Sequence, residues 1–159
     1  MTFALPARNP DAGLASMKAS LFCLRVPEYE VAKNWFIDKL DFRLVIEWLG
    51  PVGVKMAYLA AADDDRCIIE VVGDGDPPTP RASTRDLLAS FGNAGFHQFC
   101  FTVPSVVKTL SILRDRDVEV VAEPFEVPEI GRRIASFADP FGNLFELEEI
   151  LKSDSPSLP

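Results

Sequence analysis

The sequence contains a single histidine, His97, among 159 residues. A Ser-His-Asp set is not usable with so few histidines, and the chain has neither a nucleophile elbow nor a glycine-rich phosphate loop after a predicted strand. Hydrolase and dehydrogenase functions therefore have no residue support.

Cysteines and long apolar runs are also scarce. The three cysteines, Cys23, Cys67 and Cys100, show no C-x-x-C spacing, so the sequence supports neither a zinc knuckle nor a redox pair. They are typical of reduced, small apolar side chains in a cytoplasmic protein. No apolar segment approaches the roughly 20 residues that a membrane-spanning helix needs.

Basic residues are a minority, since 16 Lys and Arg stand against 24 Asp and Glu, for a net charge of -8. This charge argues against nucleic acid or an anionic membrane as a partner. The length suits one compact domain, which we expect at residues 18–151. Residues 1–17 lack the apolar core of a secretion signal, and we expect a flexible leader there and a flexible tail at 152–159.

A repeated pattern organises the domain. Cys-x-x-Val-Pro occurs at residues 23–27 and again 77 residues later, at 100–104. Two further segments repeat at a lag of 76, which pairs residues 40–42 with 116–118 and residues 69–71 with 145–147. A near-constant lag predicts a duplicated supersecondary unit, with modules at residues 18–75 and 96–151 joined by a linker at 76–95.

Hydrophobic periodicity predicts the same order of elements in both modules. In the first module we expect strands at 20–26, 42–48, 54–60 and 67–72 and a helix at 28–40. In the second we expect strands at 96–103, 118–121, 132–138 and 144–150 and a helix at 105–115. A short helix capped by Ser83 or Thr84 should end near residue 91. The predicted fold class is α+β, with two tandem βαβββ modules forming a curved eight-stranded mixed sheet, helices on its outer face and a concave cleft.

Strand alternation assigns side chains to the cleft, because the large apolar side chains of each first strand should pack on the helix. The positions left for the cleft are Leu21, Cys23 and Arg25 in the first module and Gln98, Cys100 and Thr102 at the equivalent positions of the second. Glu70 lies between Ile69 and Val71 and Glu146 between Phe145 and Leu147, so each is a carboxylate flanked by apolar residues, where a buried acid needs a partner.

The stretch Asp-Pro-x-Gly-Asn-x-x-Glu at residues 139–146, together with the strands at 99–103 and 118–121, resembles the second module of one known family. That family is the vicinal oxygen chelate superfamily, the glyoxalase I and bleomycin-resistance-like proteins. In the first half the resemblance rests on residues 24–27, 35–36 and 40–42. It covers residues 18–151 and implies the duplicated βαβββ fold.

The resemblance also implies a metal site. Enzymes of the family usually hold one divalent metal with a His or Gln from the first strand of each module and a Glu from the last. Glu70 and Glu146 match the two acidic positions, and Gln98 matches the strand position of the second module. The first-module position falls on Leu21, which cannot ligate a metal. His97 lies one residue from the motif position, and a bulge just before it would turn it toward the cleft.

Two functions follow from these residues. The first is a divalent-metal-assisted lyase or isomerase/epimerase of the glyoxalase type, acting through an enediolate on a small carbonyl- or carboxylate-bearing molecule. Its metal (Mn, Mg, Ni, Zn or Fe) would lie on Glu70, Gln98 and Glu146, with His97 as a further ligand, and Glu70 or Glu146 would be the catalytic base. The second is a metal-free, antibiotic-sequestering binding protein without a cofactor.

Either function would use the same side chains to line the cleft. These substrate-binding candidates are Arg25, Cys23, Leu21, Thr102 and Cys100. Arg25 either grips a carboxylate or phosphate of the ligand or pairs with Glu70 or Glu146. The resemblance further implies a homodimer, whose sites are built either within one chain or across two.

Overall fold

The structure is a computed structural model that describes residues 7–17, 20–75, 86–92 and 95–151. Residues 1–6 of the expected leader, residues 18–19, residues 76–85 and 93–94 of the expected linker, and the expected tail lie outside the described residues. The chain divides into two compact units, one containing the first module and the other the second. The boundaries of leader, domain, linker and tail stay predictions.

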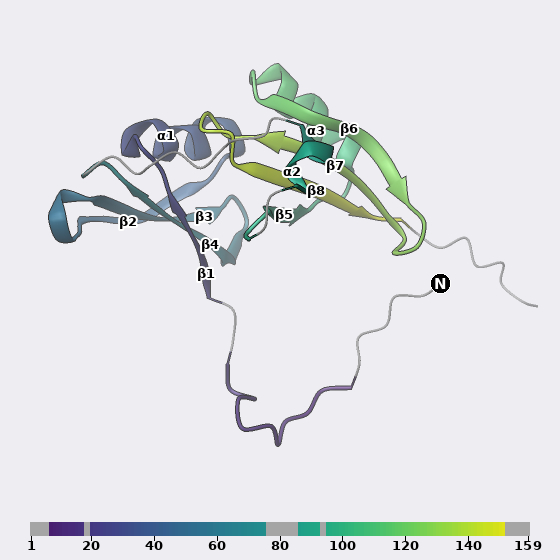
Figure 1. Cartoon of the computed structure of the whole chain (residues 1–159), viewed down its shortest axis with the longest axis horizontal. Helices are drawn as coiled ribbons and strands as arrows, with labels where there is room; N and C mark the ends of the chain where they lie inside the picture. The colour runs from purple at the N-terminus through teal and green to yellow at the C-terminus, as the bar shows by residue number, and fades with distance from the viewer. Residues whose placement is uncertain (1–6, 18–19, 76–85, 93–94, 152–159) are drawn as a thin grey trace, which may run out of the picture. The chain divides into compact units, whose positions relative to one another are not determined.

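The first module consists of β1 (Leu21–Arg25), α1 (Tyr29–Leu40), β2 (Arg43–Leu49), β3 (Lys55–Ala61) and β4 (Asp64–Gly73) (Figure 1). A short 3-10 turn at Pro51–Gly53 joins β2 to β3. The strand order is β1-β4-β3-β2. β1 pairs with β4 in parallel and the other neighbours are antiparallel, so the sheet is mixed.

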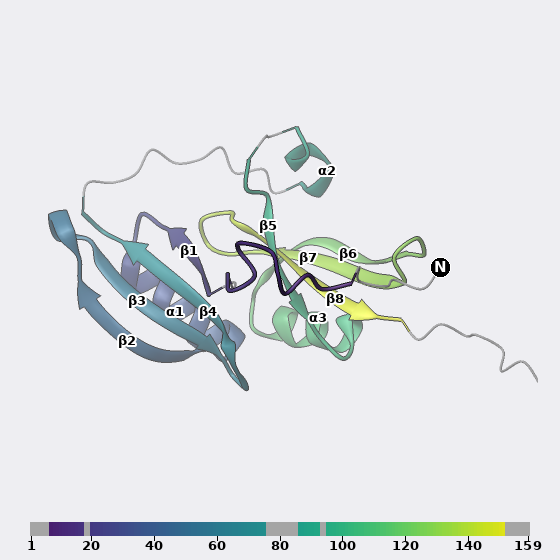
Figure 2. The same ribbon diagram turned by 90° about the horizontal axis from the view of Figure 1, so that it is seen from below.

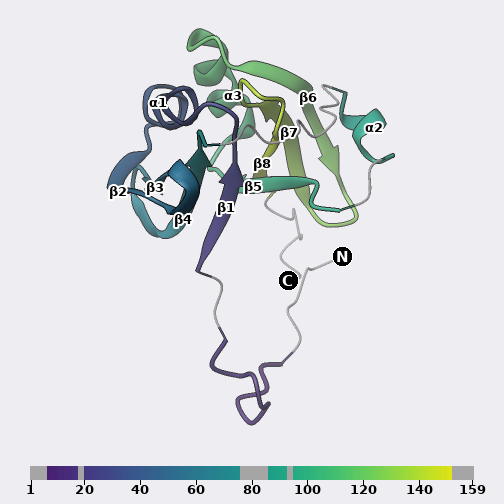
Figure 3. The same cartoon turned by 60° about the vertical axis from the view of Figure 1, so that its left-hand side comes forward.

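The second module repeats this order with β5 (Gln98–Thr102), α3 (Val106–Asp115), β6 (Glu119–Val127), β7 (Arg132–Ala138) and β8 (Leu144–Ile150). A one-turn helix, α2 (Leu87–Ser90), precedes it. The strand order is β5-β8-β7-β6, and β6 and β7 form an antiparallel hairpin (Figure 3). The α+β class and the duplicated βαβββ order are therefore confirmed. Hydrogen bonds define two four-stranded sheets, one per module, and the eight-stranded sheet with its cleft stays a prediction.

Each sheet carries its long helix on one face (Figure 2). Apolar side chains that alternate toward α1 are fully buried, among them Leu59, Ile69 and Val71. In the second module the rings of Phe101, Phe137 and Phe145 stack with centroids 5.4 to 6.4 Å apart. Burial of these faces beneath the helices leaves the alternate side chains of each strand on the opposite face of the sheet. No helix in the described ranges combines the length and hydrophobicity needed to cross a bilayer.

The two long helices end in the same way. Asp41 follows α1 and Asp117 follows the last turn after α3, and both have φ of 57°. This left-handed conformation is one that Asp adopts more readily than most residues. The next residue then closes the turn, as Phe42 N donates to Phe36 O and Val118 N donates to Leu113 O. The repeat lag of 76 thus extends to backbone conformation.

The helices also begin in the same way, on a carboxylate from the end of the last strand. Tyr29 N donates to Asp74 Oδ1 at 3.0 Å, and Val106 N donates to Glu149 Oε2 at 2.9 Å. An anion at this position satisfies a free N–H group and interacts favourably with the helix dipole. The hydrogen bond from Tyr29, with nearby Lys55 and Arg25, lowers the pKa of Asp74.

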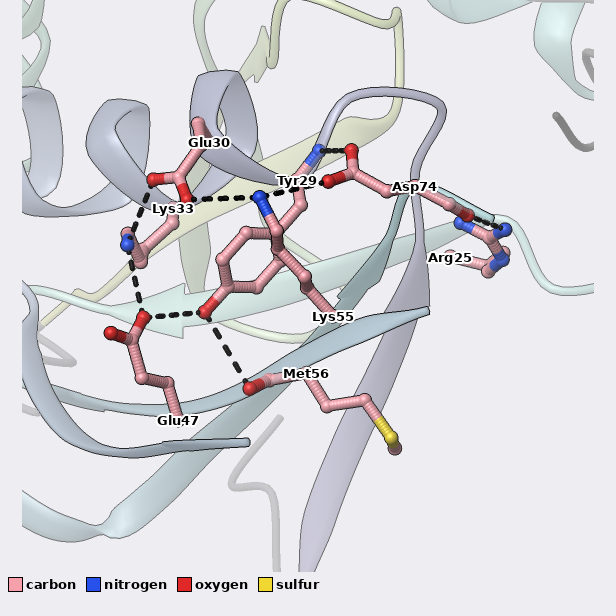
Figure 4. Close-up of polar contacts among 8 residues, drawn as sticks. All are labelled: Arg25, Tyr29, Glu30, Lys33, Glu47, Lys55, Met56 and Asp74. Atoms are coloured by element: carbon pink, nitrogen blue, oxygen red, sulfur yellow. Dashed lines mark hydrogen bonds and ion pairs between the residues drawn. The ribbon is translucent and has the colours of Figure 1, made fainter. Parts of the chain in front are cut away.

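A chain of charged groups extends from this cap along the helix side of the first sheet (Figure 4). Lys55 lies 3.2 Å from Asp74 and 3.5 Å from Glu30, and Lys33 bridges Glu30 and Glu47 at 2.9 and 3.0 Å. The hydroxyl of Tyr29 donates to Glu47 at 2.9 Å, and burial together with this hydrogen bond raises the pKa of Tyr29 to about 12. The network holds α1 to its sheet, because its members come from α1, β2, β3 and the end of β4.

The largest differences from the expected element boundaries are in β4, β6 and α2. β4 begins at Asp64, inside the expected turn, because a register shift after Ala60 lets Ala61 pair with Asp64. β6 continues through Pro124 to Val127, which an edge strand tolerates. The helix α2 is shorter than expected and is capped by Asp86, whose carboxylate accepts from Ala89 N at 2.9 Å. Ser83 and Thr84 lie outside the described residues.

Candidate functional site

The face of each sheet opposite its helix carries a glutamate at the equivalent position of the last strand. In the first module Cys23 on β1 is paired with Glu70 on β4. In the second module Cys100 on β5 is paired with Glu146 on β8. Directly opposed residues of paired strands point to the same face. The duplication therefore gives two Cys–Glu pairs at equivalent positions.

Glu146 is held by two neutral donors. Gln98 Nε2 donates to Glu146 Oε2 at 2.7 Å, and Cys100 Sγ donates to Glu146 Oε1 at 3.1 Å. The structure thus brings Gln98 and Glu146 together, as the sequence predicted from the repeat. Next along the strands, Thr102 Oγ1 donates to Glu148 Oε1 at 2.8 Å, and Arg132 lies 3.4 Å from the same carboxylate.

Both thiols are weak acids in this setting. Burial, the hydrogen bond to Glu146 and the charges of Glu146 and Glu148 raise the pKa of Cys100 to about 12. Burial, with the hydrogen bond and charge of Glu70, raises the pKa of Cys23 to about 11. At neutral pH both cysteines are therefore protonated hydrogen-bond donors.

The corresponding face of the first module is largely apolar. Leu21, opposite Ile68, takes the position that Gln98 occupies in the second module, and its side chain is 40% exposed. On the other side of Glu70, Tyr58 is its partner on β3. The Tyr58 ring meets that of Trp48 edge to face at 4.9 Å. Glu70 thus lies among apolar and aromatic side chains, with Cys23 as a donor.

Arg25 and His97 have partners that sequence patterns do not reveal. Arg25 donates to the carbonyls of Val26, Val72 and Asp74 at 2.6, 3.2 and 2.5 Å, which ties it to the end of β4. The Nε2 atom of His97 lies 2.6 Å from Ser90 Oγ, and its ring stacks on Phe91 at 4.9 Å.

These contacts place His97 against the α2 segment. The predicted roles of Arg25 as a substrate ligand and of His97 as a metal ligand stay predictions.

The donor set does not fit the four-ligand metal site that the resemblance implies. Gln98 and Glu146 form an oxygen-bearing pair in the second module, but the matching pair in the first module is Leu21 and Glu70, and leucine has no donor atom. Both oxygens of Glu146 already accept hydrogen bonds. Across the described residues no three His, Cys, Asp or Glu side chains gather in a way that would hold a metal ion.

Ser136 is a site residue that the sequence analysis missed. It is the partner of Glu146 on β7, and it is fully buried. Its Oγ atom and the Oε1 atom of Gln98 are buried polar atoms without a hydrogen-bond partner in the part of the chain that the structure describes. The signal was present, because Ser136 is a lone hydroxyl in the apolar stretch of residues 134–138. The candidate site in the second module is therefore Gln98, Cys100, Ser136 and Glu146.

Two tandem βαβββ modules, each with a glutamate on its last strand, define the architecture of the vicinal oxygen chelate proteins. The family model of the Glyoxalase/Bleomycin resistance protein/Dioxygenase superfamily matches residues 18–147, and the chain belongs to this superfamily. The resemblance predicted from the sequence is thus confirmed. No curated protein sequence matches the chain.

Solved structures share the fold at low sequence identity. The protein SMU.1112c is 20% identical with a TM-score of 0.70, and the match covers 84% of this chain and 98% of that one. TnmS3, an antibiotic binding protein from Streptomyces sp. CB03234, is 21% identical with a TM-score of 0.60 and coverages of 84% and 96%. A glyoxalase I mutant from Zea mays is 17% identical with a TM-score of 0.65, and the match covers 83% of this chain and 45% of that one.

Proposed function

We propose that this protein binds a small organic molecule without a metal ion. The proposal rests on Leu21 and Gln98, which occupy equivalent positions on the first strands of the two modules. One of the two strand positions that would supply metal ligands has no donor atom, and the other side chain is hydrogen-bonded to its own glutamate at 2.7 Å. The fold shared with the antibiotic binding protein TnmS3 supports binding as a function for this architecture.

Each module, taken by itself, presents a sheet face with its own chemistry. In the first module, Leu21, Trp48 and Tyr58 offer apolar and aromatic surface around Glu70, which suits a flat or aliphatic part of a ligand. In the second module, Glu146 and Gln98 offer polar atoms. The protonated thiols of Cys23 and Cys100 would hold the glutamates in place, since their high pKa values keep them as donors at neutral pH.

A metal-assisted lyase or isomerase is the second candidate. It is favoured by the contact between Gln98 and Glu146, which keeps half of the expected donor set, and by the buried, unpartnered Oε1 atom of Gln98. Three oxygen donors, from Glu70, Gln98 and Glu146, would be a weaker set than four. The fold shared with the Zea mays glyoxalase I also supports this candidate.

Metal content separates the two candidates. The full chain would be purified without chelator and assayed for bound divalent metal. Its thermal midpoint would then be followed on addition of Mn²⁺, Ni²⁺ or Zn²⁺. The binding function predicts no stoichiometric metal and no shift. A bound ion that is lost in Glu146→Gln, but kept in the matched control Glu148→Gln, would overturn the proposal and establish the metal-dependent candidate.

Two further parts of the proposal follow from family membership and composition. We expect a homodimer, which sedimentation analysis at several concentrations would detect. We also expect a cytoplasmic location, because the cysteines have the spacing of reduced thiols. Recovery of the native protein mainly in membrane or extracellular fractions would contradict the second expectation.

A further inference from the structure

We infer that Gln98, Ser136 and Glu146 form a recognition site for an organic ammonium group carried by the ligand. This inference rests on the proposed binding function and names the chemical class of the ligand. It places the charged end of the ligand on β5, β7 and β8 of the second module, where these three side chains share the face opposite α3.

Two buried polar atoms beside Glu146 lack hydrogen-bond partners among the described residues. Among the described residues, the buried side-chain polar atoms that have no partner are Gln98 Oε1 and Ser136 Oγ. Gln98 contacts Glu146 directly, and Ser136 is paired with Glu146 across β7 and β8. A buried polar atom without a partner is costly, and native structures contain few of them. Two of them beside a single carboxylate indicate that a donor from outside the chain completes the site.

The hydrogen bond to Glu146 fixes the orientation of the Gln98 side-chain amide. Gln98 Nε2 points at the carboxylate of Glu146, since the reverse orientation would bring two acceptor oxygens together. Gln98 Oε1 therefore points away from Glu146, and it is an acceptor without a donor among the described residues. An amide oxygen and a carboxylate accept hydrogen bonds only, and a hydroxyl can also accept. An ammonium group supplies three donors and a positive charge, and it is about the size of the water molecule that such a site would otherwise hold.

The net charge of the chain also favours a cationic ligand. The chain carries a net charge of -8, which raises the local concentration of cations and lowers that of anions. The thiol of Cys100 donates to Glu146 Oε1 and fixes the carboxylate in position. A ligand ending in a carboxylate would meet the charge of Glu146, and a ligand ending in a hydroxyl would lack the charge-assisted bond.

The inference is tested with three probes that share one hydrocarbon body: 2-phenylethylammonium, 2-phenylethanol and 3-phenylpropionate. Binding to the full chain would be followed by NMR, through the side-chain amide signal of Gln98 and the backbone amides of β8. We expect the ammonium to bind at least about tenfold more tightly than the alcohol, and the carboxylate to bind least. Glu146→Gln should abolish this preference, and Glu148→Gln should keep it.

Ser136→Ala distinguishes a ligand-binding role of the Ser136 hydroxyl from a purely structural role. Removal of a buried hydroxyl without a partner should leave the thermal midpoint of the ligand-free protein unchanged or higher, while binding of 2-phenylethylammonium weakens several-fold. Unchanged ammonium binding in Ser136→Ala would mean that the hydroxyl holds only water, and it would remove Ser136 from the site.

The outcomes also separate this inference from the proposed function. Equal binding of the ammonium and the alcohol would overturn the ammonium site and leave a metal-free binding protein. Failure of all three probes to move any signal of the second module would overturn the ammonium site as well. Mn²⁺ binding that depends on Glu146 would overturn the proposed function itself.

Discussion

The thiol of Cys100 lies 3.1 Å from Glu146 Oε1, and the register repeats this relationship between Cys23 and Glu70 in the other module. In both pairs the cysteine is the hydrogen-bond donor, and its pKa is raised by burial and by the glutamate. The duplicated Cys-x-x-Val-Pro motif therefore has a chemical meaning. Its first residue fixes a carboxylate on the open face of the sheet.

Thiol reactivity tests this relationship. A pKa of about 12 for Cys100, in place of the ordinary 9.0, leaves roughly a thousandfold less thiolate at pH 8. Alkylation of Cys100 by iodoacetamide, followed by peptide mass spectrometry, should be far slower in the native protein than in urea. Glu146→Gln should accelerate it, because the neutral amide no longer repels a thiolate, while the rate at Cys23 stays unchanged. Native labelling as fast as in urea would contradict the pairing.

Gly73 tests the packing of α1. A Cβ atom at this position would lie 2.5 Å from Tyr29 Cα and 2.6 Å from Tyr29 N, closer than real contacts allow. Since backbone atoms cannot yield, Gly73→Ala should displace the start of α1 and reduce the free energy of unfolding by about 2 kcal/mol. Urea denaturation measures the loss. Gly13→Ala is the control, because a Cβ there meets nothing within 4 Å. This change should leave the free energy of unfolding unaltered.

Asp74 makes the free energy of unfolding depend on pH in the acidic range. Its pKa is lowered by the hydrogen bond from Tyr29 and by Lys55 and Arg25, so the ionised form is the one that stabilises the fold. This contribution is present above the pKa of the unfolded chain and is lost as the pH falls through the lower pKa of the folded state.

Asp74→Asn keeps an acceptor and tolerates the positive φ of 58°. It should cost about 0.5 kcal/mol at pH 7, and the cost should shrink toward zero as the pH drops below the folded-state pKa. Urea midpoints measured across this range give the comparison. A deficit that stays constant with pH would show that the charge of Asp74 has no role.

His97 should behave as a structural residue of the α2 segment. Its contacts with Ser90 and Phe91 predict that His97→Ala speeds hydrogen exchange in residues 86–92. The same variant should leave the binding of 2-phenylethylammonium and the response to Mn²⁺ unchanged. His97→Gln, which can keep a hydrogen bond to Ser90, should show a smaller effect on exchange. Loss of ligand or metal binding in His97→Ala would return His97 to the site.

Features set by repetition and alternation could be predicted from the sequence. The lag of 76 residues located Asp41 and Asp117 at equivalent turns, and strand alternation put Gln98 and Glu146 on one face. Features set by contacts between distant segments could not be predicted from the sequence. The cap on α1 comes from Asp74, 45 residues away, and no local capping signal precedes the helix.

The same limit applied to the site itself. The sequence shows Ser136 as a lone hydroxyl in an apolar strand, but its place beside Glu146 depends on strand register and on burial. β6 runs past its apolar segment, because an edge strand accepts Pro124 and polar residues that a central strand would exclude.

The most direct test of a metal-free ammonium site is the binding of 2-phenylethylammonium to the full chain in the presence of EDTA, measured by NMR for the natural sequence and for Glu146→Gln. We expect the dissociation constant to be the same with and without the chelator, and the variant to lose binding by about tenfold or more. Binding that disappears in EDTA and returns with Mn²⁺ would contradict it, and it would assign Gln98 and Glu146 to a metal.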